Sequence, residues 1–165
     1  MKKIIIHRTP LFLLSLAFLI TILPAYAKAS EATKQNVISK TIEYFEDGSY
    51  MTITVTEDIP ATRGTLSHKS GSKDYVLTNK YGNELWRFTV HGTFSINSGV
   101  SATCTAASYS VSITNDAWEN ESASAYYSES QAIGDATFIK KLLSITVESK
   151  SCHVTLTCDS KGNLS

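Results

Sequence analysis

The sequence LWRFTVHGTFSI, residues 85–96, alternates apolar and polar side chains along its whole length. Successive side chains of a β-strand point to opposite faces, so this alternation predicts a strand with one buried and one solvated face. The buried face would carry Trp86, Phe88, Val90, Phe94 and Ile96. A second layer of structure must cover so much aromatic surface, and the stretch therefore predicts a packed sheet.

Shorter strand patterns, separated by turn signals, lie on both sides of this stretch. Residues 41–59 are expected to form a β-hairpin around Asp47-Gly48, because its second arm alternates methionine, isoleucine and valine with threonine. The apolar set changes parity within 100–114, which predicts a β-bulge near 106–108. We expect a strand rather than a helix in residues 117–131, because their many serines weaken a helix. The remaining expected strands are 75–79, 132–141, 143–147 and 152–158.

These patterns, with no convincing amphipathic helix, indicate an all-β fold. We expect an immunoglobulin-like β-sandwich of about seven or eight strands, preceded by the hairpin. The expected order is a signal peptide at 1–27, a flexible lead-in at 28–40, the hairpin at 41–59, a linker at 60–74 and the sandwich domain at 75–165. The aromatic core would come from Trp86, Phe88, Phe94, Tyr109 and Phe138.

The N-terminus has the three parts of a secretory signal peptide. A basic start (Lys2, Lys3, Arg8) precedes a 13-residue, mostly apolar run, Leu11–Leu23. Cleavage is expected between Ala27 and Lys28, with a cut after Ala29 as the second choice. An uncleaved membrane anchor is the alternative, but spanning a bilayer takes about 20 apolar residues.

Cleavage would leave 138 residues with 12 basic and 15 acidic side chains, a net charge of −3. This mild acidity gives no electrostatic footprint for nucleic acid or for anionic lipid. The expected location is extracellular, with association to the cell surface left open. The cleaved protein is not expected to be an integral membrane protein.

Three cysteines, Cys104, Cys152 and Cys158, would meet an oxidising environment after export. Six residues of straight strand separate Cys152 from Cys158, roughly 20 Å, which is too far for a disulfide. Cys104 therefore pairs with one of them or with neither. A Cys104–Cys158 disulfide is favoured because the loop that it closes would stabilise the fold by roughly 4 kcal/mol. Cys152 would then be a free thiol.

Four stretches resemble a family of small secreted proteins from Gram-positive, mainly clostridial, bacteria that is classed as a domain of unknown function. They are EYFEDGSY at 43–50, LWRFTVHGTF at 85–94, SATCT at 101–105 and VTLTC at 154–158. The resemblance covers nearly all of 41–165. It implies that Cys104 and Cys158 are the two family cysteines and that Cys152 departs from the pattern. It implies no activity and no ligand.

The residues favour a secreted, non-catalytic binding or adhesion module over two alternatives, an assembly subunit that pairs through edge strands and a hydrolase. His68, His91 and His153 do not form a recognisable catalytic set with a nucleophile. No cofactor and no metal site are expected. The candidate ligand contacts are Trp118, Tyr126 and Tyr127, and the expected partner is cell-wall glycan or another surface protein. The oligomeric state stays open.

Overall fold

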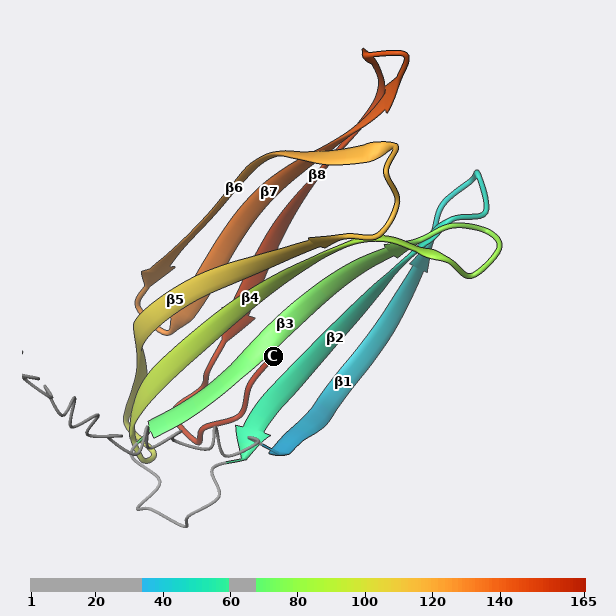
Figure 1. Cartoon of the computed structure of the whole chain (residues 1–165). Helices are drawn as coiled ribbons and strands as arrows, with labels where there is room; N and C mark the ends of the chain where they lie inside the picture. The colour runs from blue at the N-terminus through green and yellow to red at the C-terminus, as the bar shows by residue number, and fades with distance from the viewer. Residues whose placement is uncertain (1–33, 60–67) are drawn as a thin grey trace, which may run out of the picture. The chain divides into compact units, whose positions relative to one another are not determined.

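The computed structural model describes residues 34–59 and 68–165, which belong to one compact unit, Glu31–Ser165. Within these ranges the chain forms eight strands and no helix (Figure 1). The predicted all-β sandwich is confirmed, and the predicted hairpin supplies two of its strands. The strands are β1 (Lys34–Tyr44), β2 (Tyr50–Ile59), β3 (His68–Thr78), β4 (Glu84–Asn97), β5 (Ser101–Ile113), β6 (Trp118–Ser128), β7 (Gln131–Leu142) and β8 (Ile145–Thr157).

Both sheets are antiparallel and follow the order of the sequence. Strands β1 to β5 form a five-stranded sheet, and β6 to β8 form a three-stranded sheet that packs against β3, β4 and β5 (Figure 1). An immunoglobulin domain has two sheets as well, but its Greek-key connections exchange strands between them. The likeness to that fold therefore lies in the two layers and not in the strand order.

Three predicted boundaries are wrong. Residues 34–40 of the expected lead-in form most of β1, and residues 68–74 of the expected linker form the first half of β3. The hairpin is not a separate element, because β2 pairs with β3 from Tyr50↔Thr78 to Asp58↔Ser70. These segments were misassigned because their polar side chains hide the alternation of a strand. The expected signal peptide, its expected cleavage site and residues 60–67 lie outside the described residues.

The core forms where aromatic residues of β4 meet Phe138 and the small residues Ala132, Gly134 and Ala136 of β7. Trp86 stacks on Phe138 with ring centroids 4.0 Å apart and planes inclined by 5°. Further along the two strands, Gly134 of β7 faces Phe88 and Val90 of β4, and a Cβ atom at Gly134 would lie 2.4 Å from Val90 Cγ2. Large residues on one sheet thus interlock with small residues on the other.

Tyr109 does not belong to this core. It is half-exposed, although its ring lies 6.0 Å from that of Phe88. The pairing of β4 with β5 shifts at Thr105, which is one residue before the expected bulge. The extra residue changes which side chains of β5 face inward, as the change of parity in the sequence suggested.

Two turns of the domain are built in the same way. In NKYGN (79–83) and DSKGN (159–163), the first side chain accepts hydrogen bonds from the backbone N–H groups two and four residues later. Gly82 and Gly162 have φ angles of 86° and 85°, a region that favours glycine. The second turn folds the chain back, so that Leu164 pairs with Cys158 and is buried in the core.

Lysines of β3 attach this C-terminal part to the five-stranded sheet. Lys73 Nζ donates to the backbone oxygen of Thr155 over 3.0 Å. Lys69 Nζ donates to the backbone oxygen of Gly162 over 2.5 Å and forms an ion pair of 2.9 Å with Glu57. Polar side chains that looked like linker composition therefore join the two sheets.

Candidate functional site

A cleft of about 270 Å³ opens at the end of the sandwich where β1–β2, β3–β4 and β5–β6 are connected. We call it the turn-end cleft. Its walls come from five parts of the chain, and they include Asp47, Tyr81, Asn115, Trp118, Lys140 and Lys150. Loops at one end of a β-sandwich are a common place for ligands because the sheets hold them rigidly.

Charged and aromatic groups of the cleft contact one another in a fixed pattern. Glu148 forms ion pairs with Lys140 (3.6 Å) and Lys150 (3.3 Å). Lys150 Nζ also lies 4.5 Å from the centre of the Phe45 ring, which ties β8 to the first turn. Because the charges of Lys140, Glu148 and Lys150 are paired with one another, the walls of the cleft offer their hydrogen-bonding groups to a polar, uncharged ligand.

Asp47 is part of the first turn and lies at the wall of the cleft. Its Oδ1 accepts hydrogen bonds from the hydroxyl group (2.6 Å) and the backbone N–H (2.9 Å) of Ser49. These two bonds hold the pKa of Asp47 below its ordinary value. The carboxylate therefore stays ionised and helps to fix the turn.

Tyr81 is the most accessible aromatic residue of the turn-end cleft, with 78% of its surface exposed. It sits in the turn between β3 and β4, and Lys80 Nζ lies 5.1 Å from its ring centre. Sequence reasoning treated residues 80–83 only as a turn and missed this ring. An aromatic residue beside the glycine of an NKYGN turn was the available signal, because such a turn projects its side chains into solvent.

The three candidate contact residues do not form one site. Trp118 is 3% exposed and packs edge-on against Trp86 at 6.4 Å, so its prediction as a surface residue is wrong. It does contribute to the wall of the turn-end cleft. Tyr126 and Tyr127 are exposed, but they lie at the far end of β6, roughly 25–30 Å away along an extended strand. As neighbours on a strand they face opposite sides of the sheet.

Cys104, Cys152 and Cys158 are free thiols in the structure. The structure does not contain the expected Cys104–Cys158 disulfide. The Cys104 thiol donates to the backbone oxygen of Ala106 (3.3 Å), and the Cys158 thiol donates to that of Asp159 (3.6 Å). Cys104 and Cys158 nevertheless both bond through their backbone to the turn between β6 and β7. The N–H of Cys104 bonds to Glu129 O and the N–H of Cys158 bonds to Ser130 O.

Burial should make all three thiols poorly reactive in the folded protein. It raises the pKa of Cys152 to about 11 and raises the pKa values of Cys104 and Cys158 as well. Thiolates are the reactive form, so alkylation of Cys152 by iodoacetamide should accelerate about tenfold per pH unit between pH 8 and 10. Peptide mass spectrometry would measure the rates, with guanidinium-unfolded protein as the fast reference. A linked Cys104–Cys158 peptide, or fast labelling at pH 7, would contradict this expectation.

Asp135, His153 and Thr155 form a line of hydrogen bonds on the three-stranded sheet. His153 Nδ1 lies 2.7 Å from Asp135 Oδ1, and its Nε2 lies 3.3 Å from Thr155 Oγ1. This order of groups resembles a hydrolytic triad, and sequence reasoning did not find it because Asp135 is on the neighbouring strand. However, the side chains of His153 and Asp135 are 61% and 49% exposed, so nothing excludes water around them.

A second cleft, of about 390 Å³, lies on the same sheet and is lined by Ser124, Asp135, Cys152 and His153 among others. Nucleophilic catalysis needs donors that stabilise the oxyanion as well as a base and a nucleophile. The backbone N–H groups of β7 are engaged on both sides, by β6 and by β8. We therefore read the Asp135–His153 contact as a cross-strand pair.

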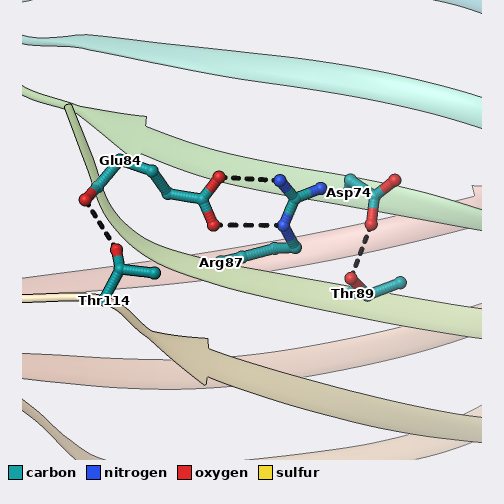
Figure 2. Close-up of polar contacts among 5 residues, drawn as sticks. All are labelled: Asp74, Glu84, Arg87, Thr89 and Thr114. Atoms are coloured by element: carbon teal, nitrogen blue, oxygen red, sulfur yellow. Dashed lines mark hydrogen bonds and ion pairs between the residues drawn. The ribbon is translucent and has the colours of Figure 1, made fainter. Parts of the chain in front are cut away.

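The outer face of the five-stranded sheet carries a second polar group of residues. Figure 2 shows the Arg87 guanidinium between the carboxylates of Glu84 and Asp74. Glu84 accepts two hydrogen bonds from it, of 2.7 and 3.2 Å, and Asp74 accepts one of 2.5 Å from Thr89. Donating these bonds to Glu84 raises the pKa of Arg87. Because the charge of its guanidinium is already balanced by Glu84, Arg87 stabilises the sheet rather than binding an anionic ligand.

Residues 34–59 and 68–165 contain no cluster of three or more histidine, cysteine, aspartate or glutamate side chains able to hold a metal ion. No helix suited to crossing a membrane occurs in that same part of the chain.

No protein-family profile, no curated protein and no solved structure matches the chain. The resemblance to the clostridial family stays a prediction, and the function must be argued from the site itself.

Proposed function

We propose that this protein is a secreted or cell-surface binding module that acts without catalysis and holds a polar ligand at the turn-end cleft. Cell-wall glycan is the ligand class that fits best. The observation that carries the proposal is the cleft itself, where the exposed Tyr81 ring lies beside Lys80 and the charged side chains of Lys140 and Glu148 line the same walls. Sugars bind to protein surfaces through this combination of aromatic faces and hydrogen-bonding groups.

Export is the second part of the proposal. The basic start, the apolar run Leu11–Leu23 and the small residues before Lys28 support a cleaved signal peptide. The exported protein would then meet wall polymers directly. A role without catalysis is supported by the open, water-exposed setting of His153 and its partner Asp135.

Replacing Tyr81 with alanine should weaken retention on purified cell wall about five- to thirtyfold, since stacking of one aromatic ring contributes roughly 1–2 kcal/mol. Tyr81 contributes no side-chain packing to the core, because most of its surface is exposed. The fold should therefore be unchanged. Co-sedimentation of the cleaved protein with purified wall, over a range of wall concentrations, would measure the change.

Tyr126→Ala is the matched control, because Tyr126 is also an exposed tyrosine but does not line the turn-end cleft and lies near the end of β6 that is remote from it. It should bind wall as well as the unmodified protein does. Loss of binding in Tyr126→Ala together with normal binding in Tyr81→Ala would move the site to the residues first suggested by the sequence. No retention of the unmodified protein on the wall, or on isolated glycans, would reject the glycan proposal.

A further inference from the structure

The hairpin that joins β7 to β8 carries exposed apolar side chains at its tip. Leu142, Leu143, Ile145 and Val147 are each more than half exposed, and Leu143 reaches 90%. Single exposed apolar residues are normal on a protein surface, but a cluster of four at one tip is not. In Figure 1 this tip extends beyond the neighbouring connections of the domain.

The backbone at this tip adds a second, independent observation. Leu143 and Ser144 have φ angles of 50° and 66°. A two-residue hairpin turn of this type normally uses Asn-Gly, because other residues are strained at positive φ. The chain therefore keeps a leucine where both its backbone and its exposure to water are unfavourable. Such an outlier points to a role for the side chain outside the domain.

We propose that the tip formed by residues 142–147 inserts into the interfacial region of a lipid bilayer. Insertion would remove the leucine, isoleucine and valine side chains from water without requiring a matching protein pocket. The proposal is independent of the ligand in the turn-end cleft.

The residues around the tip match the layers of a bilayer surface. Lys140 and Lys141 precede the tip, and three residues of strand place Lys140 roughly 10 Å from Leu143. An interfacial segment is buried by about 5–10 Å, so these lysines would lie at the level of the head groups.

The charged residues at the base of the tip are paired, so membrane binding should depend on the apolar side chains and not on the charge of the lipid. Lys140 and Lys150 pair with Glu148, and Lys141 pairs with Glu119 over 2.6 Å. Three lysines and two glutamates leave the base of the tip nearly neutral. Binding should therefore occur on zwitterionic phosphatidylcholine vesicles and change less than threefold between 50 and 500 mM salt.

The double substitution Leu143→Asn with Ser144→Gly tests the proposal without harming the fold. Asparagine and glycine suit the positive φ angles, so the variant should unfold at the same or a higher temperature. Its partition onto phosphatidylcholine vesicles, measured by co-sedimentation of the cleaved protein, should fall at least tenfold. Val100→Asn is the control, because Val100 is 72% exposed in the turn at the opposite end of β4, and it should bind vesicles normally.

Three outcomes would overturn the proposal. The first is that the unmodified protein does not bind vesicles of phosphatidylcholine, either alone or mixed with phosphatidylglycerol. The second is that the double variant Leu143→Asn, Ser144→Gly binds vesicles as well as the unmodified protein does. The third is that light scattering without lipid shows a dimer, which Leu143→Asn with Ser144→Gly dissociates. The tip would then bind a second copy of the chain. Wall binding through Tyr81 would be unaffected by any of these outcomes, so the two proposals fail separately.

Discussion

Trp86→Ala is expected to lower the free energy of unfolding by about 3–5 kcal/mol, the usual cost of removing a buried tryptophan. The side chain has no exposed surface, stacks on Phe138 and contacts Trp118 edge-on. Its loss would leave a cavity between the two sheets, next to Phe138 and Trp118. Small domains are stable by only about 5–15 kcal/mol, so the variant should populate unfolded states at moderate urea concentrations. Urea denaturation followed by circular dichroism would measure the change.

Trp86→Phe provides the matched comparison. The indole N–H of Trp86 is buried and has no hydrogen-bond partner. Phenylalanine keeps an aromatic ring against Phe138 and removes that unpaired donor, which costs free energy in the native protein. We expect a loss of less than half that of the alanine variant. Equal losses for the two variants would mean that the indole nitrogen has a partner, such as an internal water molecule.

Gly134→Ala is expected to destabilise the fold by about 1–3 kcal/mol, through overpacking rather than through a cavity. The added Cβ would lie 2.4 Å from Val90 Cγ2 and 3.0 Å from Phe88, and both neighbours are fully buried. Neither can turn away, so the three-stranded sheet must shift away from β4. Thermal unfolding would record the loss as a lower Tm.

A double variant, Gly134→Ala with Val90→Ala, tests whether overpacking against Val90 causes this loss of stability. Val90→Ala alone should also destabilise, because it empties part of the core. In the double variant the new methyl group occupies the vacated space, so the combined loss should be at least 1 kcal/mol smaller than the sum of the single losses. Simple additivity would show that Gly134 matters for its backbone and not for the spacing between the sheets.

Much of the sandwich could be predicted because β4, β7 and the end of β8 carry local alternation. Trp86, Phe88 and Phe138 were assigned to the core correctly. The edge strand β1 was missed in part because all eleven of its residues are exposed, so burial imposes no alternation on it. Lys69, Gly71 and Lys73 made β3 look like a linker. Gly71 leaves room for Thr56 and Leu164, and the lysines reach residues more than 80 positions away.

The candidate site was beyond sequence reasoning for a different reason. The turn-end cleft is assembled from five separate segments, and no local pattern indicates that Asp47, Tyr81 and Lys150 share one end of the domain. Trp118 looked like a surface residue because its neighbours, Ala117 and Glu119, gave no sign of a buried face. Only the pairing Trp118↔Lys140 places it against the core.

The burial of Leu164 affects the order of events during synthesis. This residue closes the core between Cys158 and Gly71. A ribosome must therefore translate the chain as far as Leu164 before the hydrophobic interior can be sealed. Until then the nascent polypeptide keeps unpaired strand edges that would invite aggregation or chaperone binding.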